Sequence, residues 1–339
     1  MSVEPVYNPK GVVQLQHTKK ELAVSKRKLD RLRDALVLGV IIVEHIALLA
    51  APFYFTWNAF WGSCVLLYLT NYIGISLSYH RNLTHKSFKL TKSLEYLFAY
   101  FGLHGAQGDP IFWVSIHRHH HQFTDSDRDP HSPIEGFWFS HMTWILQHTH
   151  LREKVLFIIF YFVAALGPDR YMILHYKDLL ILFYALQGGG KRNNVMDLQS
   201  QAYYRFLRST YPFHIVGLAL VLYIGGGLPH LIWGMGVRIA LGNHGSFMVN
   251  SVCHTWGAKP WNTKDLSKNN WVVSLFGSGE GWHNNHHAFE FSARLGLEWW
   301  QLDVPWYVIE LLEYLGLATD VKVPTENQKL KMSYKTHNE

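Results

Sequence analysis

Cysteine and charged residues are scarce in this sequence. Its 339 residues include 2 cysteines, and Asp, Glu, Lys and Arg together make up 17%. Two isolated cysteines give no disulfide framework or cysteine-rich metal motif, so a reducing compartment is expected for the polar part. The low charge and the 15% aromatic content, with 13 tryptophans, are more typical of membrane proteins than of soluble enzymes. Mean hydropathy near zero argues against a mostly lipid-buried bundle, so we expect a few spanning helices and a substantial polar cap.

The net charge of +6 is concentrated near the N-terminus. This segment lacks interleaved aromatics and adjoins an apolar run, so a membrane-flanking role is favoured and nucleic acid is not an expected partner. Its acidic residues and few serines are unlike a transit peptide, and its apolar run starts too late for a cleaved signal. We interpret 1–34 as a basic cytosolic segment, whose cations are Lys10, Lys19, Lys20, Lys26, Arg27, Lys28, Arg31 and Arg33.

Four apolar runs are candidates for membrane spans, because each approaches the roughly 20 residues that a bilayer requires. The connection at 52–58 is uncharged, whereas Lys and Arg crowd the outer ends of the first two runs, which places the N-terminus on the cytosolic or stromal side. The last two runs return the chain to that side. We predict an all-α integral membrane protein with two transmembrane hairpins, about four spans, and a cytosolic helical cap. The runs are 34–51, 59–79, 206–224 and 228–253.

Two features interrupt this plan. Glu44 and His45 lie within the first span and are expected to face a neighbouring helix, chiefly as an interhelical polar pair. The stretch 152–190 holds apolar runs that are too short to span comfortably, and we favour a position at the interface or against the cap. Beyond the basic segment 1–34, we divide the chain into a membrane domain at 35–330, which includes the atypical stretch 152–190, and a tail at 331–339.

Histidines gather in three clusters beside the apolar runs. His117, His120 and His121 share one helix face at about 100° per residue, and His119 points nearly opposite. The same spacing recurs in a later cluster, His283, His286 and His287. Neutral imidazole is a good ligand for iron, zinc or copper, so these clusters predict a dinuclear metal site on one membrane face.

The remaining cluster has a different spacing. His80 and His85 would diverge by about 140° on one straight helix. We therefore expect the helix to end near His80 and the chain to bend, so that both imidazoles converge. Asn250 and His254 form a further pair, four residues apart at the cap-side end of the last span.

These motifs together resemble a membrane fatty acyl desaturase of the stearoyl-CoA desaturase superfamily, closest to plant acyl-lipid Δ9-type desaturases. The similarity covers about 35–330, except for 152–190, which is atypical for the family and is either a lineage insertion or a retained intron. Phe112 stands where an acidic residue is expected, and His119 where an aromatic is usual. The motifs are His80-Arg-Asn-Leu-Thr-His85, Gly108-Asp-Pro-Ile111, His117-Arg-His-His-His121, Asp125-Ser-Asp-Arg-Asp-Pro-His-Ser-Pro133, Asn250-Ser-Val-Cys-His254 and Gly281-Trp-His-Asn-Asn-His-His287.

The resemblance implies two iron ions, O2 and an external electron donor. It assigns His80, His85, His117, His121 and His286 to one iron, and His120, His254, His283 and His287 to the other, with Asn250 linked through water. Unactivated C–H bonds have no acidic proton, so a redox metal must act on the acyl-CoA or acyl-lipid substrate. Gln107 and Trp113 are candidate lining residues for an acyl slot. Cytochrome b5 at the endoplasmic reticulum is the expected donor, with a plastid membrane and ferredoxin as the alternative.

Several interpretations stay open from the sequence. A fatty acyl hydroxylase could use the same scaffold, and a histidine-rich metal-binding protein or an inactive family member are further alternatives. A metal transporter would place histidines within spans, whereas these lie just outside them. Asp125, Asp127 and Asp129 could orient ligand imidazoles, but a capping turn beside Pro130 is favoured. The same two roles are open for Glu280, and the structural one is again favoured.

Overall fold

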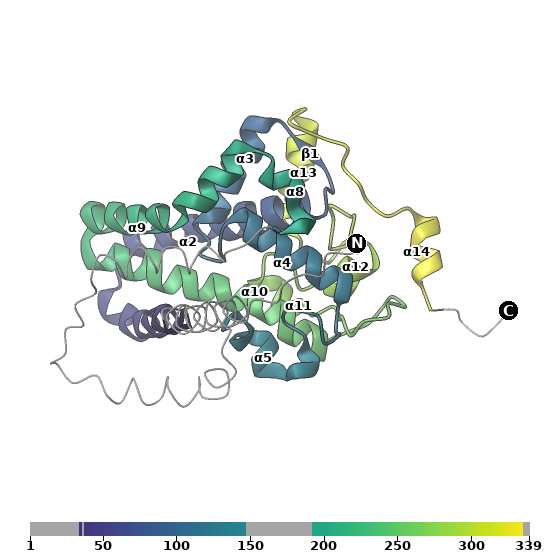
Figure 1. Cartoon of the computed structure of the whole chain (residues 1–339), viewed down its shortest axis with the longest axis horizontal. Coiled ribbons are helices and arrows are strands. Elements are labelled where there is room, and N and C mark those ends of the chain that lie inside the picture. Colours follow the sequence, from purple (N-terminus) through teal and green to yellow (C-terminus); the bar gives the residue numbers. More distant parts are fainter. Residues whose placement is uncertain (1–33, 36, 147–191, 335–339) are drawn as a thin grey trace, which may run out of the picture. The chain divides into compact units, whose positions relative to one another are not determined.

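The computed structural model describes residues 34, 35, 37–146 and 192–334 (Figure 1). Nearly all of them belong to one compact unit, Val40–Ile145 with Gln187–Glu339. The predicted helical character is confirmed, while the stretch 152–190, most of the basic segment and the end of the tail lie outside the described residues. The elements are η1 Ala51–Tyr54, α2 Trp57–Leu67, η2 Tyr68–Thr84, β1 Lys89–Leu90, α3 Lys92–Leu103, α4 Pro110–Phe123, η3 Pro133–Glu135, α5 Phe137–His141, η4 Thr143–Ile145, η5 Asn193–Val195, α8 Met196–Gln199, α9 Ala202–Leu231, η6 Ile232–Val237, α10 Arg238–Thr255, α11 Trp271–Phe276, α12 His283–Ala288, α13 Val304–Tyr314, β2 Ala318–Thr319 and α14 Glu326–Met332.

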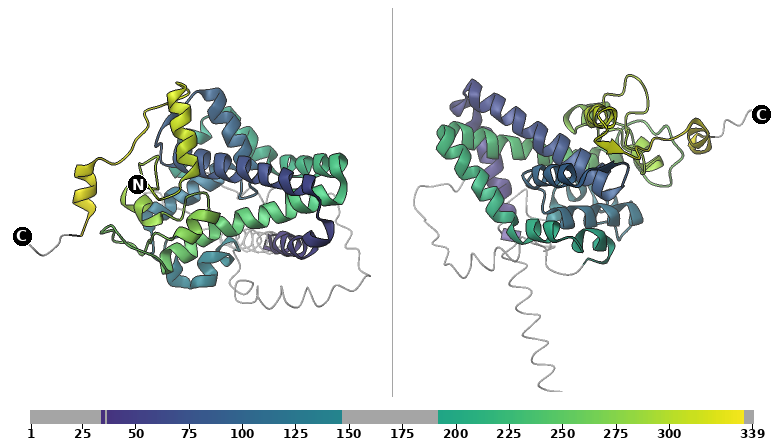
Figure 2. Two further views of the ribbon diagram at one scale, coloured as in Figure 1. Left: turned by 180° about the vertical axis from the view of Figure 1, so that it is seen from behind. Right: turned by 90° about the horizontal axis from the view of Figure 1, so that it is seen from above.

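Three helices in the described part are long and apolar enough to cross a membrane: Val37–Tyr54, Trp57–Thr84 and Ala202–Thr255. The last has 54 residues, and a straight helix of that length would extend about 80 Å, far beyond a bilayer. Gly227 interrupts it at φ 66° and ψ −157°, and the chain then runs back from the far end of α9 through η6 and α10 (Figures 1 and 2). This reversal agrees with the predicted second hairpin, and the total of four spans stays a prediction.

The polar residues of the first span do face a neighbouring helix. His45 Nε2 lies 3.3 Å from His244 Nε2 of α10, and the amide of Asn243 donates to Glu44 at 3.4 Å. Because charged and polar groups are expensive in lipid, these contacts keep them against protein. The predicted interhelical role of Glu44 and His45 is confirmed.

Helices η2 and α3 cross in backbone contact. A Cβ atom added to Gly74 would lie 2.2 Å from the backbone nitrogen of Gly102, closer than real atoms approach. Only glycine allows this crossing, which holds α3 against the helix that carries His80. The β1–β2 pair, Lys89 opposite Thr319, joins the chain just after η2 to the region beyond α13.

A buried arginine connects η2 with the C-terminal part of the cap. The guanidinium of Arg81 is 1% exposed, donates to the carbonyl of Ala293 at 2.9 Å, and pairs with Asp303 at 2.8 Å. It also contacts Glu280 at 3.2 Å. An apolar cluster that includes Leu77 of η2 and Ile309 of α13 packs beside it. Since a buried charge requires a paired partner, this network fixes the C-terminal region over the first histidine cluster.

Candidate metal centre

Nine histidines converge in two groups, and the ligand-type nitrogens within each group lie within 4.8 Å of one another. The rings of His121 and His287, one from each group, stack with centroids 4.8 Å apart, so the groups are neighbours. Their membership equals the division implied by the desaturase resemblance. Group 1 is His80, His85, His117, His121 and His286; group 2 is His120, His254, His283 and His287.

The first pair converges by a route that the sequence reasoning missed. The helix does not end near His80, because η2 continues as a π-helix through Thr84. In a π-helix the amide of residue i+5 bonds to carbonyl i, and the amide of His85 donates to the carbonyl of His80 at 3.2 Å. Residues five apart therefore lie on nearly the same face, and the two rings are 4.9 Å apart. The expected bend was wrong, and the expected convergence was right.

Helix α4 supplies three histidines from one face, as the spacing predicted. Asp109 caps its start by accepting from the amides of Ile111 and Phe112, and Pro110 fits its first turn. His117 and His121 enter group 1, and His120 enters group 2. His119 points away and lies 3.0 Å from the carbonyl of Arg128.

The short helix α12 supplies the last three histidines and is held by asparagines. The side-chain oxygen of Asn269 accepts from the amides of Asn284 and Asn285 at 2.9 and 3.0 Å. The buried amide of Asn285 makes four hydrogen bonds, including those from Trp261 Nε1 at 2.8 Å and to Gln301 at 2.9 Å. This bonding fixes α12 although it has only 6 residues.

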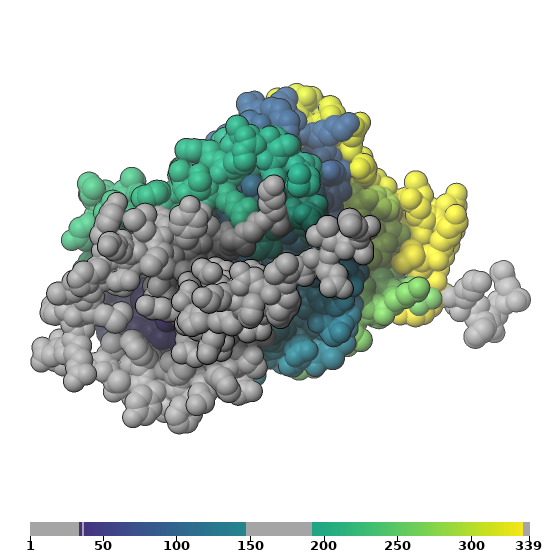
Figure 3. Space-filling view, in the orientation of Figure 1, coloured from purple at the N-terminus to yellow at the C-terminus, as the bar shows by residue number. Residues whose placement is uncertain are grey.

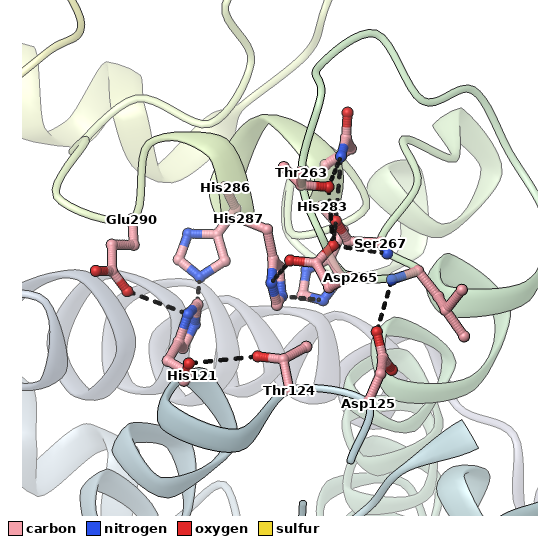
Figure 4. A network of polar contacts seen from close by, with 12 residues as sticks. His121, Thr124, Asp125, Thr263, Asp265, Ser267, His283, His286, His287 and Glu290 are labelled. Atoms are coloured by element: carbon pink, nitrogen blue, oxygen red, sulfur yellow. Dashed lines mark hydrogen bonds and ion pairs between the residues drawn. The ribbon is translucent and has the colours of Figure 1, made fainter. Parts of the chain in front are cut away.

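Five of the nine imidazoles have a carboxylate at Nδ1. Glu280 lies 2.7 Å from His80, and Asp265 lies 3.1 Å from His287. The loop beyond α4 and the end of α12 provide the other three. Figure 4 shows Asp265 and Glu290 beside their imidazoles. The remaining pairs are His120–Asp129 at 2.9 Å, His254–Asp125 at 3.0 Å and His121–Glu290 at 3.3 Å.

Counting protons shows what these carboxylates do. A carboxylate accepts, so an imidazole that donates to one from Nδ1 has a bare lone pair on Nε2, as in His120, His254 and His287. In group 2, Nε2 of His283 lies 2.9 Å from that of His254 and 3.0 Å from that of His287. One proton on His283 cannot satisfy both lone pairs. In group 1, His286 stands in the same position between His80 at 3.1 Å and His121 at 2.9 Å.

Burial keeps six of the nine rings neutral. It lowers the pKa of His85, His117, His120, His283 and His286 well below the ordinary value, and neighbouring imidazoles lower it further. Burial is also the main reason why the pKa of His121 falls to about 4. Burial alone would raise the pKa of Glu280, but His80 and Arg81 outweigh it and bring the pKa to about 2. At neutral pH these six imidazoles are therefore neutral nitrogen donors, and Glu280 is an ionised carboxylate.

This donor set fits a pair of transition-metal ions. A cation at the centre of each group would occupy the lone pairs that no proton can satisfy, and Nε2 of His85 is buried without a hydrogen-bond partner among the described residues. Imidazole nitrogens suit iron, zinc and copper. Carboxylates behind metal-binding histidines fix the ring orientation and raise the basicity of the ligand.

The other predicted residues lie close to these groups. Trp113 stacks on His117 with ring centroids 5.0 Å apart and donates from Nε1 to Gln107 at 3.1 Å. Gln107 in turn donates to Ser246 of α10 at 2.8 Å. Asn250 lies on α10 one turn before His254.

The carboxylates were only partly foreseen. The sequence favoured a capping role for Asp125 and Asp129. Asp129 does accept from the amide of His131 at 3.1 Å, but the side chains of both residues also contact histidines of group 2. Glu280 likewise binds His80. Asp265 and Glu290 were missed, because neither belongs to a histidine motif and no spacing connects Asp265 with α12.

Comparison with known proteins now places the chain. A fatty acid desaturase family model matches residues 55–313. The chain belongs to the fatty acid desaturase family. It is 53% identical over 301 residues to an acyl-CoA 5-desaturase of Anemone leveillei, with 88% of this chain and 83% of that protein covered.

Two Arabidopsis thaliana proteins are similarly related. A chloroplastic palmitoyl-monogalactosyldiacylglycerol delta-7 desaturase is 49% identical, with 93% of this chain and 76% of that protein covered. Delta-9 acyl-lipid desaturase 1 is 47% identical, with 93% and 92% covered. The predicted family is confirmed, and the relatives' names include three double-bond positions.

Proposed function

We propose that this protein is an oxygen-dependent fatty acyl desaturase of the Δ9 type, which converts a saturated acyl chain on CoA or on a glycerolipid into a cis-monoene. The observation that supports this most is the pair of histidine groups, whose buried Nε2 atoms face one another with too few protons between them. Family membership supports the reaction class.

Two irons are the proposed occupants. Group 1 would hold one, and group 2 the other, with Asn250 reaching the second through a water molecule. When bound, the irons and O2 would supply the oxidising power to remove hydrogen from two adjacent methylenes, which acid–base residues cannot do.

The protein's own part is to prepare the donors. Asp265 accepts from Nδ1 of His287, which directs the Nε2 lone pair of His287 inward, and Glu280 pairs with Nδ1 of His80. His286 and His80 of group 1 are 1% and 3% exposed, so these two donors are shielded from solvent. His80 and then Arg81 lower the pKa of Glu280, and the ion pair with Arg81 holds this carboxylate in place.

We assign the acyl chain to a slot beside Trp113 and Gln107. The indole stacks on His117, so a chain packed along it would lie next to group 1. The hydrogen bonds from Trp113 to Gln107 and from Gln107 to Ser246 connect α4 with α10 and would fix the width of that slot.

We further propose an endoplasmic-reticulum membrane protein with four spans, whose N-terminus and metal centre face the cytosol and whose electrons come from cytochrome b5. A plastid membrane with ferredoxin is the alternative. The reversal at Gly227 supports an even number of spans in the second half of the chain.

The test is double-bond analysis by gas chromatography–mass spectrometry in a desaturase-deficient yeast. His120→Ala should abolish new monoenes, whereas His119→Ala, on the same helix but pointing away, should retain them. The derivatised fragments give the double-bond position, and fragments at another carbon would contradict the Δ9 type. Hydroxylated products in place of monoenes would contradict desaturation, as would an iron-loaded, reduced protein that makes neither.

A further inference from the structure

An indole lies against the first histidine group. The ring of Trp113 stacks on that of His117, with centroids 5.0 Å apart and 27° between the planes, and it lies 6.2 Å from the ring of His80. Both imidazoles belong to group 1. Tryptophan and tyrosine carry the aromatic rings that lose an electron most readily. A strong oxidant held by group 1 therefore has an electron donor in contact with its ligands.

Tyrosines continue from this indole toward α3 and α9. The ring of Tyr79 lies 5.9 Å from that of Trp113. Tyr79 and Tyr204 are both 0% exposed and belong to one buried cluster, against which Trp113, Tyr96 and Tyr203 pack. Aromatic rings thus follow one another from the metal ligands to the packing of α3 on α9.

Three of these tyrosines form what we call the tyrosine cluster, Tyr96, Tyr203 and Tyr204. Tyr96 stacks on Tyr203 at 4.2 Å, and Tyr204 lies 5.6 and 5.7 Å from the two rings. Figure 3 shows the blue atoms of α3 beside the teal-green atoms at the start of α9 on the drawn face. Tyr96 and Tyr203 are half-buried, and the exposed ammonium of Lys92 lies 5.7 Å from the Tyr96 ring. The tyrosine cluster therefore reaches a surface that soluble reductants can approach.

The hydroxyl groups decide which ring can keep a radical. A tyrosine that loses an electron becomes a strong acid, so its radical is stable only where a base takes the phenolic proton. The hydroxyl of Tyr204 donates to the carboxylate of Glu95 at 2.8 Å, which is within reach for such a transfer. The hydroxyl of Tyr79 is buried without a hydrogen-bond partner among the described residues. Tyr79 can therefore only pass the electron on, whereas Tyr204 can hold the radical.

We propose that Trp113, Tyr79 and Tyr204 form a route by which unused oxidising equivalents leave the metal centre and end as a neutral radical on Tyr204. This rests on the proposed function for its oxidant, which is iron oxidised by O2 or a peroxide when no acyl chain is bound. Trp113 gives one electron to the oxidised centre, Tyr204 replaces that electron through Tyr79, and Glu95 takes the phenolic proton. A soluble one-electron reductant such as ascorbate then returns the electron, and Glu95 returns the proton.

Core packing alone does not account for these side chains. Phenylalanine would fill the place of Tyr79 equally well, and a buried hydroxyl without a hydrogen bond costs about 1 to 3 kcal/mol. The electron-rich phenol is easier to oxidise than a phenyl ring, so it makes the better bridge. The route also has a use, because an oxidant able to attack an unactivated C–H bond would otherwise attack the nearest imidazoles.

The test is electron paramagnetic resonance of the iron-loaded protein, frozen at intervals after it is mixed with hydrogen peroxide in the absence of acyl substrate. The wild type should show a neutral tyrosyl signal, and Tyr204→Phe should lose it. Tyr72→Phe is the matched control and should keep the signal, because Tyr72 lies on the same helix as Tyr79 and its ring contact is with Tyr68. Zinc-loaded protein should give no signal, since zinc has no redox chemistry.

Two further variants test the separate steps. Glu95→Gln removes the proton acceptor but leaves an oxygen for the Tyr204 hydroxyl, so the signal should form about 100-fold more slowly. Trp113→Phe should slow it as well while iron content is unchanged, because a phenyl ring on His117 is harder to oxidise. Peptide mass spectrometry should find faster oxidation of His80 and His117 in Tyr204→Phe than in the wild type, and bound acyl substrate should remove that difference.

A wild-type signal in Tyr204→Phe, or an equal loss in Tyr72→Phe, would overturn the proposal. Iron content and thermal unfolding check that each variant is folded. If Tyr204→Phe does not fold, wild-type rates of radical formation in Glu95→Gln and Trp113→Phe would overturn it instead. The proposed function fails separately: a wild-type protein that forms the radical but no monoene contradicts desaturation alone, whereas monoene formation without any radical contradicts the route alone.

Discussion

Replacing Asp265 with Asn should weaken metal binding in group 2 although Asp265 is not a predicted ligand. Its Oδ1 accepts from Thr263 Oγ1 and from the amide of Ser267, both at 3.0 Å. An asparagine oxygen would keep that position, so the amide NH2 would face Nδ1 of His287. Two donors would then oppose each other, and His287 would have to move its proton to Nε2, the atom that faces His283 at 3.0 Å.

The expected size follows from this loss of a ligand lone pair. Partners behind a metal-binding histidine typically change metal affinity 10- to 100-fold, which is about 1.4 to 2.7 kcal/mol. The assay is competition between the purified protein and a chelator for Fe²⁺ and Zn²⁺. Binding to group 2 should weaken by that factor, and binding to group 1 should change less.

Two further substitutions serve as controls for this prediction. Asp197→Asn removes a carboxylate that binds Arg118 at 2.9 Å and contacts no predicted ligand, so metal affinity should stay at the wild-type value. Glu290→Gln removes the carboxylate at His121, but Glu290 is 60% exposed, so water can replace it and the effect should be smaller. Unchanged affinity in Asp265→Asn, or an equal loss in Asp197→Asn, would refute the reasoning.

Three more outcomes follow from the structure. Gly74→Ala should lower the free energy of unfolding by about 3 kcal/mol, because the new Cβ meets the backbone of α3. Gly62→Ala should leave this free energy unchanged, because the space around its Cβ is open. Thermal unfolding in detergent compares the two variants. Burial, then His244, lowers the pKa of His141 to about 4. Between pH 6.5 and 4 the unfolded chain therefore binds more protons than the folded protein, so the free energy of unfolding should decrease as the pH is lowered through that window, by up to about 3 kcal/mol. A His141→Phe variant whose stability has the same pH slope would contradict this. Trp113→Phe removes the hydrogen bond to Gln107 but keeps the ring on His117, so the chain-length preference of the products should broaden while iron content is unchanged, as product analysis and metal assay will show.

Spacing within a helix was informative because helix geometry is local. The face shared by His117, His120 and His121 followed from 3.6 residues per turn, and the structure has it. The spacing of His80 and His85 misled, because the argument assumed an α-helix and η2 is a π-helix. No propensity in the sequence announces that change of hydrogen-bond pattern, which depends on packing against α3 and α13.

The sequence by itself determined the helical class, the apolar runs, the family and the identity of the nine converging histidines, because each depends on composition, periodicity or a contiguous motif. Only the tertiary structure decided which carboxylate stands behind which imidazole. Asp265 and His287 are 22 residues apart, and Glu280 and His80 are 200 apart, yet each pair is in contact. Such pairs arise where loops of different helices meet, and chain folding rather than local preference brings them together.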